Sequence, residues 1–202
     1  MKILVTGFDP FDKEKINPAW EAVKRLPDTI LDSEIIKLEI PTVQKKSVDK
    51  IKEAMDKYDP DVILSIGQAG GRYDISVERI GINIDDYRIK DNDGNQPVDN
   101  IIIKDAPAAY FSTIPVKKIV EGIKSIGIPA SVSNTAGTFV CNHVLYSISH
   151  LIEGTNKQSG FIHIPYTLEQ VVEKRDMPSM STDTVVLALK KAIEIIIIEK
   201  NK

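Results

Sequence analysis

Short apolar runs alternate with amphipathic helical stripes along the whole sequence, a pattern typical of an α/β sheet protein. Strand-like runs cover residues 3–5, 34–40, 61–66, 130–133 and 160–165. Helical stripes run from about residue 18 to 26, 48 to 58, 116 to 126, 141 to 152 and 181 to 200. Because run 61–66 is almost continuously apolar, it is expected to lie at the centre of the sheet.

The middle of the chain is less regular. Residues 75–84 alternate between apolar and polar side chains as a strand does, and 101–103 are a further candidate strand. Segment 85–110 is expected to be a long loop broken by turns, since aspartate, glycine and proline recur in it. No internal repeat or low-complexity linker divides the 202 residues, so a single domain spanning 1–202 is expected.

Charge, hydropathy and cysteine content exclude several classes of protein. The net charge is −3 and lysines and arginines do not cluster, which argues against a nucleic-acid partner. The apolar run 195–198 is far too short to cross a membrane, and residues 1–7 are typical of a first strand rather than a secretory signal. A single cysteine cannot form an intrachain disulfide, which fits a cytoplasmic location.

That cysteine, Cys141, follows a glycine-containing turn and opens a helix. In the first turn of a helix a thiol faces unpaired N–H groups and the positive end of the dipole, and both favour the nucleophilic thiolate. The alternative is that Cys141 simply packs in the core, as free cysteines commonly do. It begins an apolar stripe made up of Val144, Leu145, Ile148, Leu151 and Ile152. The helical spacing alone favours a cysteine packed in the core, so the choice between a core residue and a nucleophile depends on other segments of the chain.

Glu78 is a second candidate, because alternation puts it on the same side as the isoleucines at 80, 82 and 84. A carboxylate on an apolar face is costly unless a donor meets it. Three interpretations remain: an ion pair with a nearby arginine or lysine, a register slip that exposes the group, or a buried acid that orients a histidine.

Three histidines are candidates for that partner. His143 would point away from Cys141 on a helix, and His150 falls on the polar side of the same stripe. His163 lies at the end of a short apolar strand, and ligand sites of open α/β sheets lie at strand ends. His163 is therefore the candidate base, although a hydrogen-bonded core histidine fits the pattern equally well. Together, Glu78, His163 and Cys141 are the residue types of a hydrolase in which a carboxylate orients a histidine and the histidine activates a thiol nucleophile. The sequence contains no spacing of residues typical of a metal site.

The glycine-rich stretch 67–72 has the composition of a phosphate-binding loop. Such a loop opens directly into a helix, whereas the residues from 75 onwards alternate like a strand. Close approach of the backbone to a small ligand, or a plain tight turn, fits this stretch better.

The sequence also carries five blocks in order: TGFDPF (6–11), NPAWE (17–21), GQAGGR (67–72) with ER (78–79), NTAGTFVCN (134–142) and FIHIP (161–165). Together they resemble the pyroglutamyl peptidase I family, also called pyrrolidone carboxyl peptidases. The resemblance implies an α/β/α sandwich with a mixed, mostly parallel twisted sheet. It also implies a cysteine peptidase that acts on peptides with an N-terminal pyroglutamate, uses no cofactor and commonly forms a homotetramer.

Position by position, the resemblance makes Cys141 the nucleophile, His163 the base, Glu78 its orienting partner and Arg88 a support of the oxyanion. The positions that match the substrate pocket are Phe8, Phe11, Thr42, Gln68, Ile89, Phe139 and Val140. An aromatic pocket suits pyroglutamate, which is a neutral lactam without a charged amine, although core packing remains an alternative for each phenylalanine.

The chain departs from the family at Asp12-Lys13, where a glycine pair is usual, which leaves the shape of this loop open. Two rival hypotheses also stay open: a thiol enzyme acting on another amide or a purine-like ring, and a module that binds a nucleotide through 67–71.

Overall fold

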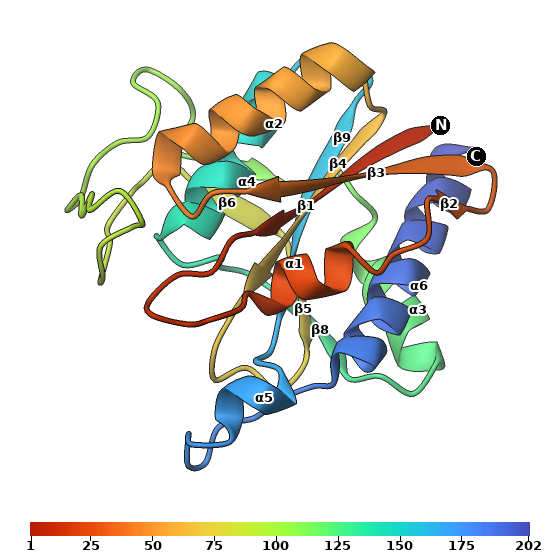
Figure 1. Cartoon of the computed structure of the whole chain (residues 1–202). Helices are drawn as coiled ribbons and strands as arrows, with labels where there is room; N and C mark the ends of the chain where they lie inside the picture. The colour runs from red at the N-terminus through yellow and green to blue at the C-terminus, as the bar shows by residue number, and fades with distance from the viewer.

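A seven-stranded sheet lies at the centre of the computed structural model, which describes residues 1–202 (Figure 1). Its strand order is β2-β3-β1-β4-β9-β5-β8. The strands are β1 (Lys2–Phe8), β2 (Thr29–Ile30), β3 (Ser33–Ile40), β4 (Val62–Gln68), β5 (Ile75–Glu78), β8 (Ala130–Ser133) and β9 (Gln158–Ile164). Strands β3, β1, β4 and β9 run parallel, β2 pairs antiparallel with β3, and β5 pairs antiparallel with β9 and parallel with β8.

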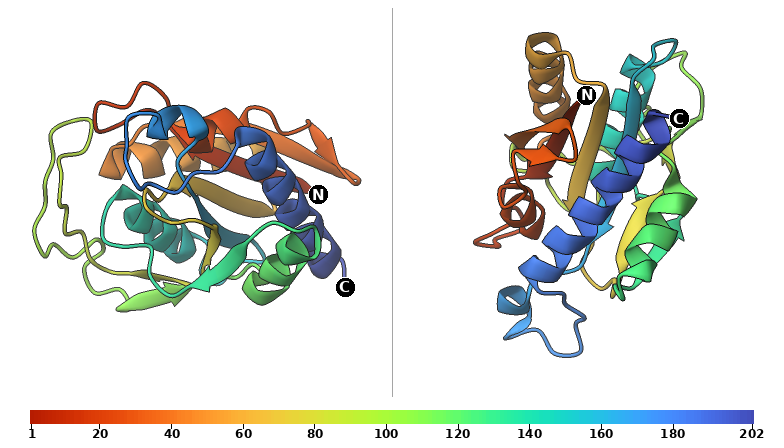
Figure 2. Two further views of the ribbon diagram at one scale, coloured as in Figure 1. Left: turned by 90° about the horizontal axis from the view of Figure 1, so that it is seen from below. Right: turned by 90° about the vertical axis from the view of Figure 1, so that its right-hand side faces the viewer.

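Helices cover both faces of this sheet (Figure 2). One face carries α1 (Pro18–Val23), α3 (Val116–Ser125) and α6 (Thr182–Lys200). The other face carries α2 (Gln44–Tyr58) and α4 (Val140–Leu151). The expected α/β/α sandwich with a mixed, mostly parallel sheet is therefore confirmed.

The central strands are buried on both sides, which explains their continuous apolar sequence. Along β1, Ile3 and Val5 pack with the α1, α3 and α6 layer, whereas Leu4 packs with the α2 and α4 layer. Every residue of β4 from Val62 to Gly67 is buried, as expected of a central strand. Each fully buried aliphatic side chain contributes roughly 1.5–3 kcal/mol, so the two faces together supply the main stabilisation of the sandwich.

Local capping explains where two of the helices begin. The Asn17 side chain accepts a hydrogen bond from the Ala19 N–H at 3.0 Å, and Pro18 occupies the first helical position. Ser181 caps α6 in the same way, accepting from the Thr184 N–H at 3.1 Å. Both signals are visible in the sequence.

The segment 75–84 is not one strand. β5 ends at Glu78 in the main sheet, and β6 (Ile80–Ile82) pairs instead with β7 (Ala109–Phe111) in a separate two-stranded sheet. The backbone changes partners at Arg79, whose N–H donates to the Ser133 carbonyl while its own carbonyl accepts from the Ser112 N–H. Glu78 is buried as expected, but not on a face shared with the later isoleucines.

Three further expectations need correction. Residues 101–103 form no strand, because the Asn83 side chain bonds both the N–H and the carbonyl of Ile103. Segment 85–110 is the expected loop, except that β7 begins at Ala109. Leu151, expected on the buried stripe of α4, is 39% exposed.

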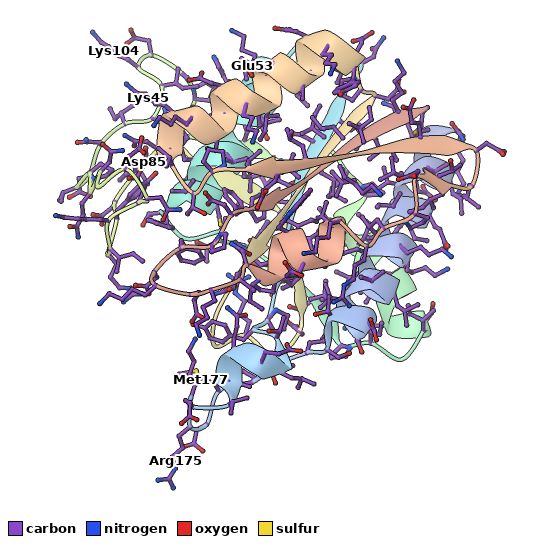
Figure 3. All side chains as sticks on the ribbon, viewed as in Figure 1. Lys45, Glu53, Asp85, Lys104, Arg175 and Met177 are labelled. Carbon is purple, nitrogen blue, oxygen red and sulfur yellow. The ribbon has the colours of Figure 1, made fainter.

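A short helix, α5 (Leu168–Val171), lies in the segment between β9 and α6. This segment projects from the body of the molecule, with Arg175 and Met177 near its tip (Figure 3). The Gln170 side chain ties its base to β4 by donating to Oε1 of Gln68 at 2.9 Å. None of the helices is long and apolar enough to cross a membrane.

Candidate active site

Glu78 and His163 form a buried hydrogen bond between neighbouring strands. Oε1 of Glu78 lies 2.7 Å from Nδ1 of His163, and the two side chains are 0% and 4% exposed. Strand β5 runs antiparallel to β9 with Glu78 opposite Phe161, so Glu78 is diagonal to His163 on the same face. The antiparallel register of β5 and β9 therefore brings together two side chains that lie near the ends of separate strands.

Arg72 completes this network. Its Nη1 donates to the same Oε1 of Glu78 at 2.7 Å, and its Nη2 donates to the Thr135 carbonyl at 3.1 Å. Two of the interpretations considered for Glu78, an ion pair and a histidine partner, thus hold together. Sequence reasoning missed Arg72 as a member of the site, although the need of a buried carboxylate for a cation pointed to an arginine nearby.

Cys141 is the second residue of α4, in the first helical turn as expected. Its sulfur lies against Gly67 of β4, where an added Cβ would approach Sγ to 2.9 Å. Gly67 is in turn the register partner of His163 on the adjacent strand. No hydrogen bond joins Cys141 directly to His163, but both side chains line the same cavity.

The protonation states follow from burial. Burial raises the pKa of Cys141 to about 12, and the Glu78 charge adds to this rise, while Arg72 and the cysteine's own N–H oppose it. Burial also lowers the pKa of His163, against the opposing effect of Glu78. The site therefore contains a neutral thiol and a neutral imidazole. Desolvation thus outweighs the N-terminus of the helix, and the pKa of Cys141 moves opposite to the direction that its place in the first helical turn favours.

Glu78 stays ionised. Burial alone would raise its pKa, but the hydrogen bonds from His163 and Arg72 bring the pKa below its ordinary value. An ionised Glu78 accepts the Nδ1 proton of His163 and leaves Nε2 unprotonated, which is the tautomer that a general base needs.

An inner cavity of about 290 Å³ lies beside the sulfur. Its lining comprises Phe8, Phe11, Asn17, Thr42, Gln68, Ala69, Gly70, Arg72, Ala136, Gly137, Phe139, Cys141 and His163. The rings of Phe11 and Phe139 lie with their centroids 6.0 Å apart and their planes tilted by 36°. No carboxylate side chain lines this cavity, so it suits a neutral, partly apolar group.

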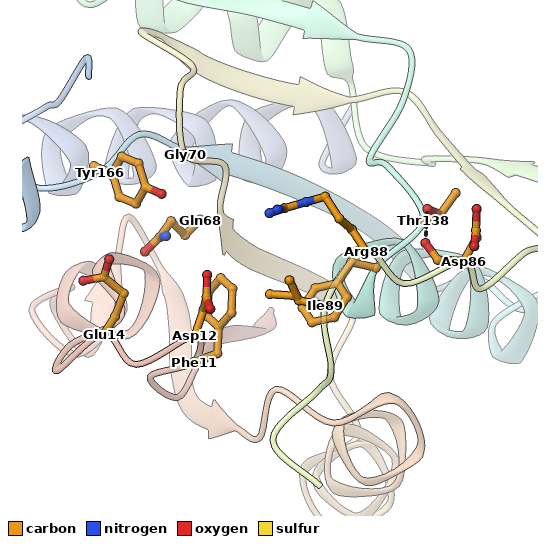
Figure 4. Close-up of a pocket in the computed structure, with 11 residues that line it drawn as sticks. Phe11, Asp12, Glu14, Gln68, Gly70, Asp86, Arg88, Ile89, Thr138 and Tyr166 are labelled. Carbon is orange, nitrogen blue, oxygen red and sulfur yellow. Dashed lines mark hydrogen bonds between the residues drawn. The ribbon is translucent and has the colours of Figure 1, made fainter. Parts of the chain in front are cut away.

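An outer cavity of about 330 Å³ adjoins the inner one and shares Phe11, Gln68, Gly70 and Phe139 with it. The Arg88 side chain extends across it toward Gln68 and Tyr166 (Figure 4). Ile89 also lines the outer cavity and not the inner one.

Of the expected pocket residues, five line the inner cavity: Phe8, Phe11, Thr42, Gln68 and Phe139. Val140, the first residue of α4, lines neither cavity, because its side chain is fully buried in the hydrophobic core.

Comparison with known proteins agrees with this geometry. The family model described as pyroglutamyl peptidase matches residues 1–199. This chain belongs to the pyroglutamyl peptidase family. It is accordingly a cysteine-type hydrolase, as the resemblance of the five sequence blocks predicted.

Individual relatives are similar over nearly their whole length. The pyrrolidone-carboxylate peptidase of Finegoldia magna is 61% identical over 199 residues, covering 98% of this chain and 93% of the relative. That of Fusobacterium nucleatum is 62% identical over 202 residues, covering 99% and 94%. The solved pyroglutamyl peptidase I of Bacillus amyloliquefaciens has a TM-score of 0.95 at 48% identity, covering 98% of this chain and 96% of that one.

Asp12 and Lys13, where the chain departs from the glycine pair of the family, have an unusual backbone conformation. Both residues adopt left-handed backbone conformations, with φ of 51° and 64°. Glycine reaches this region without steric cost, which explains the glycine pair usual in the family. In this peptidase Asp12 and Lys13 adopt these backbone angles although both carry side chains.

The other two histidines lie outside the cavities beside Cys141. His143 is buried and its Nδ1 lies 2.8 Å from Oδ2 of Asp85, so it points away from the thiol as expected. His150 is only partly exposed, and its Nδ1 lies 2.8 Å from the Tyr110 hydroxyl. On the polar side of α4, His150 is thus held by Tyr110 and is not simply solvated.

Proposed function

We propose that this peptidase removes an N-terminal pyroglutamyl residue from peptides, with Cys141 as nucleophile, His163 as base and Glu78 as its orienting partner. The observation that carries the proposal is the 2.7 Å hydrogen bond between Glu78 and His163, beside the cavity that the Cys141 sulfur also lines. Membership of the family supports the same reaction.

The first half of the reaction transfers a proton and an acyl group. Nε2 of neutral His163 takes the Cys141 proton as Sγ attacks the pyroglutamyl carbonyl, so a thiolate is needed only at the moment of attack. Glu78 stabilises the imidazolium that forms. His163 then gives the proton to the leaving amine, the C–N bond breaks and a thioester remains.

The second half releases the product. His163 accepts a proton from water, and the resulting hydroxide attacks the thioester carbonyl. The C–S bond breaks, pyroglutamate leaves, and the proton returns to Cys141. In both halves the negative charge on the carbonyl oxygen is assigned to the Cys141 backbone N–H and to Arg88, whose side chain lines the adjoining outer cavity. No step needs a cofactor or metal.

Recognition of the lactam ring is assigned to the inner cavity. Phe8, Phe11 and Phe139 enclose the ring, and Gln68 and Thr42 supply polar contacts. The absence of a carboxylate from this lining supports a neutral ring over a free N-terminal ammonium.

The remaining pocket positions have supporting roles in the proposal. Ile89 lines the outer cavity, beside the shared Phe11 and Phe139, and Val140 belongs to the buried core cluster that also contains Phe8. The rest of the peptide leaves through the outer cavity, along the residues shown in Figure 4.

A turnover assay on pyroglutamyl-, prolyl- and glutamyl-arylamides tests the proposal. Cleavage should be confined to the pyroglutamyl compound, and Cys141→Ser should lose at least about 100-fold in kcat while folding normally. His163→Gln should lose a similar factor, whereas the matched His150→Gln should not. Preference for the prolyl compound, or full activity of Cys141→Ser, would refute the assignment.

We also propose that residues 1–202 act as a single peptidase domain in the cytoplasm, assembled as a homotetramer, with no nucleic-acid or membrane partner. Exposed apolar side chains support assembly: Val98, Ile101 and Phe111 are 67%, 67% and 66% exposed. Light scattering in solution should give four times the chain mass, and a monomeric mass would contradict the tetramer.

A further inference from the structure

Arg72 connects the orienting carboxylate to the turn that leads into α4. Its side chain is 30% exposed and borders the inner cavity. Nη1 donates to Oε1 of Glu78 at 2.7 Å, and Nη2 donates to the Thr135 carbonyl at 3.1 Å. Thr135 belongs to the turn between β8 and α4, six residues before Cys141 in the sequence. One guanidinium group therefore contacts both sides of the site.

The carboxylate depends on this contact. Glu78 is fully buried, and Oε1 accepts both of its hydrogen bonds, from Arg72 and from His163, while Oε2 has no partner. A buried carboxylate needs a counter-charge to remain ionised, and neutral His163 does not supply one. Arg72 is the cation that contacts it.

Arg72 also fixes geometry. The Ser133 hydroxyl donates to the same Thr135 carbonyl at 3.0 Å, and Nη1 of Arg72 lies 3.4 Å from that hydroxyl. A planar guanidinium presents its donors in a fixed fork, so it can set the spacing between two acceptors in a way that a single ammonium cannot.

We propose that Arg72 is a positioning residue, which holds Glu78 as an anion and ties it to the turn before Cys141, so that His163 is correctly oriented for the thiol. This inference rests on the proposed function for its catalytic consequence. Its structural consequence, the state of the His163–Glu78 hydrogen bond, can be measured without turnover.

The test compares Arg72→Gln, Arg72→Lys and the control Arg25→Gln by steady-state kinetics and by proton NMR of the imidazole Nδ1–H signals. Arg25 also pairs with a carboxylate, Asp183 at 3.3 Å, but on the exposed surface away from the cavities. The His143–Asp85 hydrogen bond, 2.8 Å and buried, provides an internal reference in the same spectra. His163→Gln identifies the His163 signal by removing it.

Arg72→Gln should lower kcat on pyroglutamyl-arylamide by about 10- to 100-fold with little change in KM, because transition-state positioning is lost. The His163 signal should shift or vanish through exchange while the His143 signal stays in place. Arg72→Lys should be intermediate, about 3- to 10-fold down in kcat, since it keeps charge but not the fork. Arg25→Gln should behave as wild type.

An Arg72→Gln variant with kcat within twofold of wild type, or with lowered kcat but an unmoved His163 signal, would overturn the inference. If Arg72→Gln does not fold, Arg72→Lys becomes the test. Wild-type kcat together with an unmoved His163 signal in Arg72→Lys would exclude the positioning role of Arg72. If the wild-type chain fails to cleave the arylamide, the proposed function falls, yet the NMR comparison still decides whether Arg72 positions His163.

Discussion

Glu78 and His163 lie 85 positions apart in the sequence, yet Oε1 of one and Nδ1 of the other are 2.7 Å apart. The contact is diagonal across an antiparallel strand pair, in which Glu78 faces Phe161 directly. The strand register thus brings the imidazole beside the carboxylate, with Nδ1 toward Oε1 of Glu78.

Glu78→Gln tests this hydrogen bond. The amide keeps the shape but loses the charge that stabilises an imidazolium, so kcat should fall by about 100-fold or more. The folded state should also lose about 1–3 kcal/mol, because the Arg72 guanidinium loses its charged partner. Steady-state kinetics and urea unfolding measure the two effects. Activity close to wild type would mean that His163 does not depend on Glu78.

The pH dependence of kcat/KM follows from His163. Burial lowers its pKa from the ordinary 6.5, and the base must be neutral to accept the Cys141 proton. Activity should therefore be sustained at pH 6.5 and fall only at lower pH, as His163 becomes protonated. A pH–rate profile checks this, and an acid limb centred above pH 6.5 would contradict it.

The lowered pKa values of Glu78 and His163 also make the free energy of unfolding depend on pH. Glu78 and His163 both have folded-state pKa values below their ordinary values of 4.5 and 6.5, so the unfolded chain binds protons more readily. Their stabilisation should be complete above pH 6.5 and should be lost progressively as the pH falls, first through His163 and then through Glu78. Urea unfolding between pH 4 and 8 measures this, and greater stability at pH 5 than at pH 7.5 would count against it.

Gly67→Ala should disturb the nucleophile. The new Cβ would lie 2.7 Å from the Phe161 ring and 2.9 Å from Sγ of Cys141, so the sulfur or the ring must move. We expect at least about a tenfold loss of kcat and a destabilisation of about 1–3 kcal/mol. The matched Gly122→Ala in α3 meets only the flexible side chains of Ile195 and Lys191, so it should keep activity and gain up to about 1 kcal/mol. Equal kinetics for the two variants would disprove the contact.

Lys13→Gly should stabilise the peptidase. Lys13 has φ of 64°, where a side chain costs about 1–2 kcal/mol, and part of this strain is relieved by glycine. A gain of up to about 1 kcal/mol is expected in urea unfolding, reduced by the extra flexibility of glycine in the unfolded chain. Lys24, with φ of −63°, is the matched control, because Lys24→Gly relieves no strain and should destabilise. Similar losses in both variants would show that the loop is unstrained.

Local sequence signals predicted much of the fold because they act over a few residues. The start of α1 at Pro18, the apolar run of β4 and the stripe of α6 all appear where expected. Alternation failed at Arg79, where the chain changes from one sheet to another without any break in its apolar and polar pattern. A local pattern reports that a segment is extended, but not which strand it joins.

By itself the sequence determined the α/β class, the positions of the main strands and helices, and, through its five blocks, the family and the candidate set of Glu78, His163 and Cys141. Tertiary structure alone decided that Arg72 meets Glu78, that Val140 lines neither cavity, and that burial raises the pKa of the Cys141 thiol. The reason is physical: side-chain propensity and periodicity are local, whereas desolvation and charge pairing depend on groups that only folding brings together.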